Sequence, residues 1–435
     1  MTKQENRDTG AAAAGQGQPQ KASPWAEQLV RAALPHAPKD GSIEAKAEFL
    51  RGLVEKLKAF MEFEKWDSRP VESVVVKRGY REVESLKGHS DVVTCLQAFP
   101  DGRIVSGSDD ETLRVWTRSA KGKWSSEVLT GHTDGVYCLQ ALPDGRIVSG
   151  GKDEALRVWT RGSDGKWSSE VLSGHTKSVT CLQALPDGRI VSGSWDDNLR
   201  VWTRGSDGKW SSEVLSGHTT WVNCLKALPD GRIVSGSDDN TVRVWTRGAD
   251  GKWSSEVLSG HTREVTCLQA LPDGRIVSGS YDEDLRVWTR SAKGKWSSEV
   301  LSGHTGNVTA LQALPDGRIV SGSHDRTLRV WTRGADKTWS SEVISGHTQI
   351  VWCLQALPDG RIVWGGKQDD CTLCLWTKDA EGEWHGEWFY DYQTDDHVQG
   401  AVTCLQALPD GRIVSGSRDA TLLIWDGTPI EGGEP

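Results

Sequence analysis

The sequence predicts an all-β protein built from eight small sheets arranged around a common axis, and three observations lead to this expectation. The hexapeptide Pro-Asp-Gly-Arg-Ile-Val occurs eight times in the 435 residues without a change, first at Pro100 and last at Pro409. The dipeptide Gly-His recurs about every 43 residues from Gly88 to Gly346. Between these markers stand short apolar runs separated by turn residues. Self-similarity at a fixed period is the sequence mark of a repeat architecture.

Each repeat is expected to form four short antiparallel strands. The apolar runs are four to seven residues long and rich in Val, Ile, Leu and Trp, which suits a strand and is too short for a helix. Pro, Asp and Gly of the hexapeptide fit a tight hairpin turn between the first and second strands, with Gly at positive φ. The runs are almost continuously apolar, so both faces of each sheet should be covered. Radial stacking provides this cover, and the result is a β-propeller.

The ends of the repeat region predict how the ring closes. A fourth, outer strand follows each of the first seven units, but nothing remains after Trp425 to supply one for the eighth. Residues 82–89, "EVESLKGH", end as the other outer strands do and precede the first unit. We therefore expect an eight-bladed propeller closed by an N-terminal outer strand, because closure removes free sheet edges.

Composition along the chain suggests five segments. Residues 1–22 are rich in Ala, Gly and Gln and are expected to be a disordered tail. A small α-helical segment is expected over residues 23–70, since Ser23 and Pro24 form a helix-start signal and the second half carries an apolar stripe. Residues 71–81 are a linker, 82–426 the propeller and 427–435 a C-terminal tail. The helical stripe must be buried on the propeller, on a second copy or on a partner.

Charge and hydropathy narrow the function classes. The net charge is −9, from 51 basic and 60 acidic residues, which argues against nucleic acid as the main partner. No run approaches the roughly 18 apolar residues of a membrane span, and the N-terminus lacks the apolar core of a secretory signal. Nine cysteines in such a chain are expected to be reduced thiols. We expect a cytoplasmic protein that binds neither nucleic acid nor membrane.

The order of motifs within a unit resembles the WD-repeat β-propeller family. Gly-His is followed by V-x-x-L, by Pro-Asp-Gly, by S-G-S-x-D, and by a Trp six residues beyond that Asp. The resemblance covers residues 81–426 in eight registered copies. The chain departs from the family pattern at one position. This Trp is usually followed by Thr, as at Thr117, and the Trp-Asp dipeptide that gives the family its name occurs at this place only as Trp425 and Asp426.

Each unit contains His, Ser and Asp, which invites comparison with a catalytic triad. The resemblance implies instead that His, Ser, Asp and Trp form a buried hydrogen-bond network that ties a loop to the sheet. Eight repeats of one triad would also mean eight identical active sites. The expected structural network comprises His89, Ser106, Asp110 and Trp116 in the first unit, then His132, Asp153, Trp159, His175, Asp196, Trp202, His218, Asp239, Trp245, His261, Asp282, Trp288, His304, Asp325, Trp331, His347, Asp370, Trp376, Asp419 and Trp425.

The copies differ in two places, the stretch after Gly-His and the turn around the network Asp. In a propeller both lie on one rim, which in the family is the usual partner-binding surface. Free drift of surface loops predicts mostly small and charged substitutions, whereas these slots hold several Trp and Tyr, residue types enriched in interface hot spots. The candidate partner-binding residues are Asp109, Tyr137, Lys152, Trp195, Trp221, Arg263, Tyr281, His324, Arg326, Trp352, Trp364 and Arg418.

Two functions remain open at this point. The first is a non-enzymatic interaction scaffold or recognition module that binds a protein or peptide on the varied rim, with the N-terminal helices free to engage a further partner or a second copy. The alternative is a multivalent carbohydrate-binding propeller, which would use the outer-strand Trp of each repeat as equivalent sugar sites. No unique polar cluster, cofactor motif or metal-ligand pattern is evident: the cysteine slot of the first strand accepts Ala310, and the single C-x-x-C at Cys371 has no companion.

Overall fold

The computed structural model describes residues 82–345, 349–366, 373–379, 382–389 and 400–425. The chain divides after Val76 into two units, and only the second, residues 77–435, contains described residues. The expected tail over 1–22, helical segment over 23–70, linker over 71–81 and C-terminal tail over 427–435 lie outside the described residues. None of the described residues belongs to a helix that could cross a membrane.

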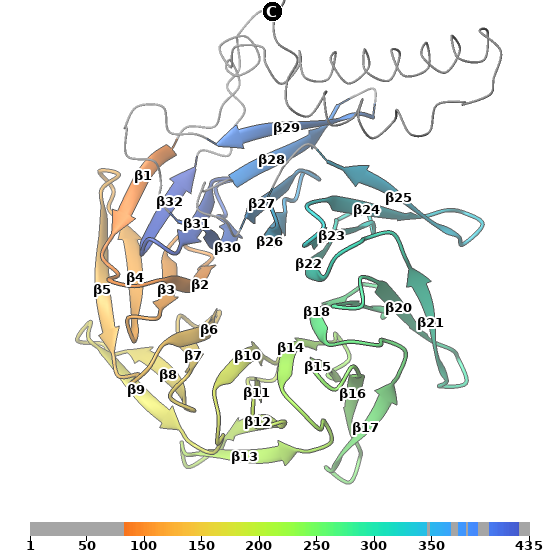
Figure 1. Ribbon diagram of the computed structural model, residues 1–435. Helices are drawn as coiled ribbons and strands as arrows, with labels where there is room; N and C mark the ends of the chain where they lie inside the picture. Colours follow the sequence, from red (N-terminus) through yellow and green to blue (C-terminus); the bar gives the residue numbers. More distant parts are fainter. Residues whose placement is uncertain (1–81, 346–348, 367–372, 380–381, 390–399, 426–435) are drawn as a thin grey trace, which may run out of the picture. The chain divides into compact units, whose positions relative to one another are not determined.

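Thirty-two strands form eight four-stranded antiparallel sheets, and Figure 1 shows these sheets as the blades of a ring. In blades one to seven the strands follow chain order, with the first strand of each blade nearest the centre and the fourth at the circumference. Blades one to four comprise β2 (Val93–Ala98), β3 (Ile104–Ser108), β4 (Thr112–Arg118), β5 (Trp124–Thr130); β6 (Val136–Ala141), β7 (Ile147–Gly151), β8 (Leu156–Arg161), β9 (Trp167–Leu172); β10 (Val179–Ala184), β11 (Ile190–Ser194), β12 (Leu199–Arg204), β13 (Trp210–Leu215); and β14 (Val222–Ala227), β15 (Ile233–Ser237), β16 (Val242–Arg247), β17 (Trp253–Leu258). Blades five to eight comprise β18 (Val265–Ala270), β19 (Ile276–Ser280), β20 (Leu285–Arg290), β21 (Trp296–Leu301); β22 (Val308–Ala313), β23 (Ile319–Ser323), β24 (Leu328–Arg333), β25 (Trp339–Ile344); β26 (Val351–Ala356), β27 (Ile362–Gly366), β28 (Leu373–Lys378), β29 (Trp384–Phe389); and β30 (Val402–Ala407), β31 (Ile413–Ser417), β32 (Thr421–Trp425), β1 (Glu82–Lys87).

The N-terminal strand β1 completes the eighth blade, as the sequence predicted. It pairs antiparallel with β32, with Leu86 opposite Leu422. Leu86 is buried in a core cluster that also contains Val93 and Ile104 of blade one. The hydroxyl of Thr403 in blade eight donates to the carbonyl of Val93 across the same junction. The ends of the propeller are therefore joined by strand pairing, apolar packing and a hydrogen bond.

The core lies between blades rather than within one sheet. The cluster between blades three and four, for example, brings Val201 and Leu215 of one blade against Val222 and Trp245 of the next. The second strands, such as β11, are buried along their whole length. This burial explains why β11 contains only Ile, Val, Ser and Gly and no charged residue, because a strand covered on both faces has no exposed face for polar alternation.

Two glycines of the repeat serve different purposes. Gly102 in the first Pro-Asp-Gly turn has φ of +84°, and its amide donates to the carbonyl of Phe99 at 3.0 Å. This left-handed conformation favours glycine. Gly193, the middle residue of a Ser-Gly-Ser stretch, lies where a Cβ would stand 2.7 Å from Val222 Cγ1 of the next blade and 2.8 Å from Cys181 Sγ. Its lack of a side chain permits the close approach of neighbouring blades.

Candidate binding site on the loop rim

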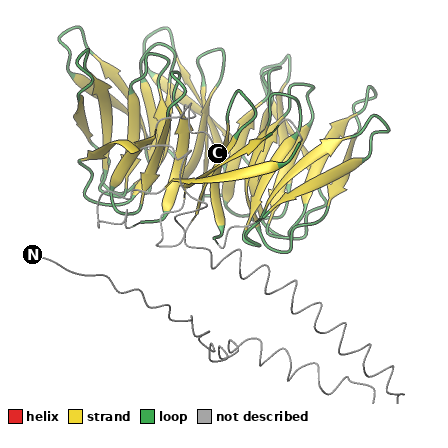
Figure 2. Cartoon of the chain, turned by 90° about the horizontal axis from the view of Figure 1, so that it is seen from above, coloured by secondary structure: helices red, strands yellow, loops and turns green. Residues whose placement is uncertain are grey.

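The varied positions of the repeat lie on one rim, which we call the loop rim. It consists of the loops that precede the first strands, the first two residues of those strands, and the turns that join the second strands to the third. Because the first two strands of a blade are antiparallel, the end of the second lies beside the start of the first. The amide of Trp195 donates to the carbonyl of Ser178, and the amide of Asp238 to that of Trp221, both at 3.0 Å. Figure 2 shows, edge-on, that loops occupy both ends of the strands. The Pro-Asp-Gly turns join the first strands to the second, so they lie at the end opposite the loop rim.

A chain of aromatic rings crosses the loop rim from blade two to blade four. Tyr137 contacts Trp195 with 5.9 Å between ring centroids, and Trp195 stacks on Trp221 at 4.8 Å with 25° between the planes. Lys152 lies over the Tyr137 ring at 5.6 Å. Contact with the Tyr137 hydroxyl raises the pKa of Lys152, so this amine is charged at neutral pH.

A second chain of rings runs from blade five to blade seven. His324 lies between Tyr281, at 6.3 Å, and Trp352, on which it stacks at 6.5 Å with 22° between the planes. The guanidinium of Arg263 lies 5.7 Å from the Tyr281 ring centroid. Six aromatic side chains from six blades thus form two groups around the centre of the loop rim.

The two groups of rings face one cavity of about 560 Å³, which we call the aromatic cavity. Its walls contain Trp195, Trp221, Tyr281 and Trp352. Its remaining lining residues are Asn223, Asp238, Glu264, Thr266 and Thr309. Four residues that the sequence singled out are therefore brought together at one site.

The lining residues Asn223, Glu264, Thr266 and Thr309 are absent from the sequence-based candidates. Thr266 and Thr309 occupy the second position of their first strands, which also holds Thr in several other repeats. They look like part of the common repeat. Asn223 follows Val222, the first residue of β14, and Glu264 precedes Val265, the first residue of β18; neither residue type recurs at its place in the other repeats. The identity of the residues on either side of this Val is the sequence signal that could have pointed to the cavity, because Trp221, Asn223 and Glu264 all line it.

Other candidate residues lie outside the aromatic cavity. Lys152, Arg263, Arg326 and Arg418 are exposed on the loop rim, while Asp109 is half-buried. Burial raises the pKa of Asp109, against the attraction of Lys152. Arg326 has φ of +65° in the turn after the network Asp of blade six. These charged groups surround the aromatic residues without lining the cavity.

Trp364 is a correction, because it is not on the rim surface. It is 0% exposed and belongs to the core cluster between blades six and seven. It occupies the place that Ser321 has in blade six, and this position of the second strand faces the blade interior. Its cross-strand partner is Cys374, where blade six has Arg329 opposite Ser321. Trp364 is larger than Ser321 and Cys374 is smaller than Arg329, so the two substitutions compensate each other in volume.

The expected hydrogen-bond network is present in blades one to six. In blade five, His261 Nδ1 lies 2.8 Å from Asp282 Oδ2, His261 Nε2 lies 2.7 Å from Ser278 Oγ, and Trp288 Nε1 donates to Ser278 Oγ at 2.8 Å. Since the indole can only donate, the serine hydrogen is free to donate to His Nε2, and Nδ1–H then donates to the carboxylate. The same bonds connect His89, Ser106, Asp110 and Trp116; His132, Ser149, Asp153 and Trp159; His175, Ser192, Asp196 and Trp202; His218, Ser235, Asp239 and Trp245; and His304, Ser321, Asp325 and Trp331.

The last two blades depart from this pattern. His347 and Asp370 lie outside the described residues. Trp376 is buried, and its Nε1 has no hydrogen-bond partner among the described residues, because Trp364 stands where the other blades have serine. In blade eight, Trp425 Nε1 donates to Ser415 Oγ at 3.0 Å, and Asp419 accepts from the amide of Thr421 at 3.0 Å.

The carboxylates of the network are held in the charged form. Burial alone would raise the pKa of Asp282, but hydrogen bonds from His261 and from the amide of Thr262 lower it to about 2. Burial lowers the pKa of His89, against the attraction of Asp110. In blade one the pKa of Asp110 is also lowered, so the network there contains a neutral imidazole and a carboxylate at neutral pH.

The outer-strand tryptophans fasten neighbouring blades. Trp210 Nε1 donates to Glu170 of the preceding blade at 2.8 Å, and Arg204 donates to the same carboxylate. Trp210 also packs against the core cluster between blades two and three. The described residues show a corresponding Trp–Glu bond at Trp167, Trp339 and Trp384.

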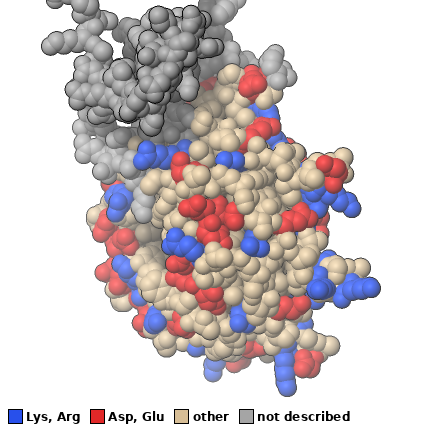
Figure 3. All heavy atoms as spheres, turned by 45° about the vertical axis from the view of Figure 1, so that its right-hand side comes forward, with Lys and Arg blue, Asp and Glu red and all other residues tan. Residues whose placement is uncertain are grey.

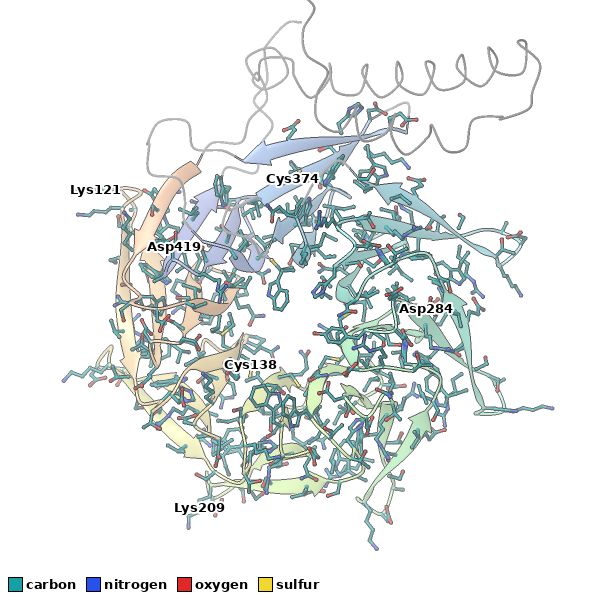
Figure 4. The ribbon with its side chains drawn as sticks, in the orientation of Figure 1. Lys121, Cys138, Lys209, Asp284, Cys374 and Asp419 are labelled. Atoms are coloured by element: carbon teal, nitrogen blue, oxygen red, sulfur yellow. The ribbon has the colours of Figure 1, made fainter. Side chains whose placement is uncertain are left out.

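One face of the propeller is mixed in charge. Figure 3 shows basic side chains interspersed with acidic ones on the face in view. In Figure 4 the labelled Lys121 and Lys209 point outward at the circumference, whereas Cys138 lies toward the centre. Burial raises the pKa of the first-strand thiols, to about 12 for Cys95 and Cys181. Among the described residues there is no group of three or more His, Cys, Asp or Glu suited to a metal ion.

Comparison with known proteins finds a matching family model and, among others, one similar protein and one similar solved structure. The model of the WD40 family, "WD domain, G-beta repeat", matches residues 80–117, 124–160, 167–203, 210–246, 253–289, 296–332, 339–377 and 391–426. The F-box/WD repeat-containing protein 7 of Drosophila melanogaster is 55% identical over 53 residues, which are 12% of this chain and only 3% of that protein. The solved "WD40 beta propeller domain of Doa1" has a TM-score of 0.52 and 23% identity, over 80% of this chain and 98% of that one. The last likeness shows the fold alone.

Proposed function

Because this chain belongs to the WD40 repeat family, whose propellers are common protein-interaction modules, we propose that it is a non-enzymatic scaffold that binds a protein or peptide on its loop rim. The observation that carries the proposal is the convergence of Trp195, Trp221, Tyr281 and Trp352 on one cavity. Trp221 is 42% exposed, which is unusual for so large an apolar side chain. Rigid aromatic residues around a concavity are typical of interface hot spots.

The His, Ser and Asp sets support a structural role rather than catalysis. A serine nucleophile must reach a substrate, yet Ser278 is 0% exposed and its oxygen accepts a hydrogen bond from Trp288. The same arrangement recurs in blades one to six, so none of these sets is distinguished as a unique reactive site. We propose that the chain performs its function without chemistry at these residues.

The carbohydrate-binding alternative receives less support from the circumference. A sugar site would need one face of each outer-strand indole to be available. The guanidinium carbons of Arg232 and Arg290 lie 5.8 and 5.9 Å from the ring centroid of Trp296, and the indole packs against the core between blades four and five. We therefore favour a single site on the loop rim over a ring of equivalent sites.

Selection from a random peptide library on the full chain tests this function. The selected peptides should lose binding when Trp195, Trp221 and Trp352 are all changed to Ala. The matched control changes Val171, Val214 and Val257 to Ala, three exposed apolar residues on the outer strands. Equal binding to both variants, or no enriched peptide at all, would contradict the proposal.

A further inference from the structure

We propose that the aromatic cavity receives the positively charged side chain of a lysine or arginine in the bound peptide. This inference rests on the proposed function, because it names the chemistry of the partner at the same site. Three properties of the cavity support it. Aromatic ring faces form its walls, the charged residues that line it are acidic, and the donors of Asn223, Thr266 and Thr309, which we call its floor, are already hydrogen-bonded.

The rings supply attraction for a cation from more than one side. Trp195 and Trp221 come from blades three and four, whereas Tyr281 and Trp352 come from blades five and seven. The face of an aromatic ring carries negative electrostatic potential, and Trp attracts cations most strongly. A cation between these walls would contact several rings at once.

The charged groups that line the cavity are both acidic. They are Asp238 and Glu264, and no Lys, Arg or His is among the described lining residues. Glu264 Oε2 accepts no hydrogen bond within the described part of the chain, and Arg263 Nε lies 3.4 Å away in ion-pair range. The Glu264 side chain is 34% exposed, so a ligand N–H group can reach its carboxylate and donate to it.

The floor offers few donors to an anion. Thr266 and Thr309 each donate a hydroxyl hydrogen, at 2.6 Å, to the first-strand carbonyl of the next blade. Asn223 donates to Asp238 at 2.6 Å and to the carbonyl of Val265 at 3.1 Å. Because the donors of these three side chains are already engaged, a phosphate or carboxylate beside them would find acidic neighbours and no uncommitted hydrogen from Thr266, Thr309 or Asn223.

The chain itself shows how a guanidinium is accommodated beside the cavity. Arg263 lies over the ring of Tyr281 and within ion-pair range of Glu264, so it contacts one ring and one carboxylate. Its side chain is 54% exposed, which leaves it at the edge. A ligand arginine or lysine entering the cavity would make contacts of the same kind with Asp238 and the remaining rings. The volume of about 560 Å³ exceeds one such side chain, so flanking peptide residues would also enter.

The direct test uses small probes on the full chain labelled with 5-fluorotryptophan. N-acetyl-arginine amide is titrated against its neutral isostere, N-acetyl-citrulline amide, while the fluorine resonances of Trp195, Trp221 and Trp352 are followed. Trp→Phe variants assign these resonances. We expect saturable shifts with the arginine compound and at least about tenfold weaker binding of the citrulline compound.

Charge variants complete the experiment. Asp238→Asn with Glu264→Gln should weaken arginine binding by about tenfold and reduce its salt dependence. The control Asp164→Asn with Asp207→Asn removes the same charge from the turns between third and fourth strands, at the far end of the blades, and should leave binding unchanged. Equal shifts with citrulline, or no shift with arginine, would overturn the inference. The proposed function would still stand if library peptides required Trp221 and Trp352.

Discussion

Trp195 and Trp221 stack with 4.8 Å between their ring centroids, although they come from different blades and from different loops of the repeat. Trp195 belongs to the turn after β11, and Trp221 directly precedes β14. Neither residue occurs at the same place in any other copy of the repeat. The pair is therefore built from two separate departures from the repeat that meet on the loop rim.

Changing Trp221 to Ala should weaken binding of a library-selected peptide by about 2 kcal/mol, the size expected of an interface hot spot. Its stability cost should stay below about 1 kcal/mol, because the side chain is 42% exposed and is not a core residue. Calorimetric titration and thermal unfolding measure the two effects on one sample. Val214→Ala, at 48% exposure on an outer strand, is the control for both.

Ser278→Ala should destabilise the protein by about 1–3 kcal/mol without altering peptide binding. The change leaves Trp288 Nε1 and His261 Nε2 without their shared partner in a buried site. Guanidinium denaturation compares it with Ser297→Ala, an exposed outer-strand change whose weak bond to the carbonyl of Thr289 is 3.5 Å long. Equal midpoints for the two variants would show that the network contributes little.

Leu86→Ala should destabilise the propeller by about 2–5 kcal/mol, since this side chain is 4% exposed in the cluster that joins blades eight and one. Val128→Ala on the outer strand of blade one removes a side chain that is 45% exposed and should have little effect. Thermal unfolding of both variants checks the closure. A melting temperature for Leu86→Ala equal to that of the parent would mean that β1 does not secure the ring.

Acid should destabilise the propeller in two stages. The pKa of His89 is lowered in the fold, so below about pH 6.5 the unfolded chain takes up a proton first and stability begins to fall. The pKa of Asp282 is about 2 in the fold against 3.8 ordinarily, so its contribution is complete above pH 3.8 and is lost between 3.8 and 2. Chemical denaturation at pH 7, 5, 4 and 3 measures the slope.

Asp282→Asn provides the check on that assignment. Its stability deficit relative to the parent should be greatest at neutral pH and should narrow as the pH falls from 4 toward 2, because the parent loses the same charge. A deficit that stayed constant across this range would rule out the charge of Asp282 as the cause.

The fold could be predicted closely because every repeat contains the same pattern of strands and turns. Aligning the eight copies with one another therefore defines where each strand begins and ends. The eight blades and the closing strand β1 follow from this repetition. The site was harder to predict. Trp364 was placed on the rim because it adjoins a varied turn, although strand alternation turns its side chain inward. Asn223 and Glu264 do not stand out in the sequence, because small and charged substitutions are also what free drift of surface loops produces, and only the ring shows that they share a cavity.

The central claim, that partners bind at the aromatic cavity, is tested most directly by hydroxyl-radical footprinting of the full chain with and without a selected peptide. This method reports the solvent exposure of individual aromatic side chains. We predict that bound peptide reduces oxidation of Trp221, Trp195 and Trp352 and leaves the outer-strand Trp210 and Trp296 unchanged. Protection of the outer-strand tryptophans with no change at Trp221 would contradict the account.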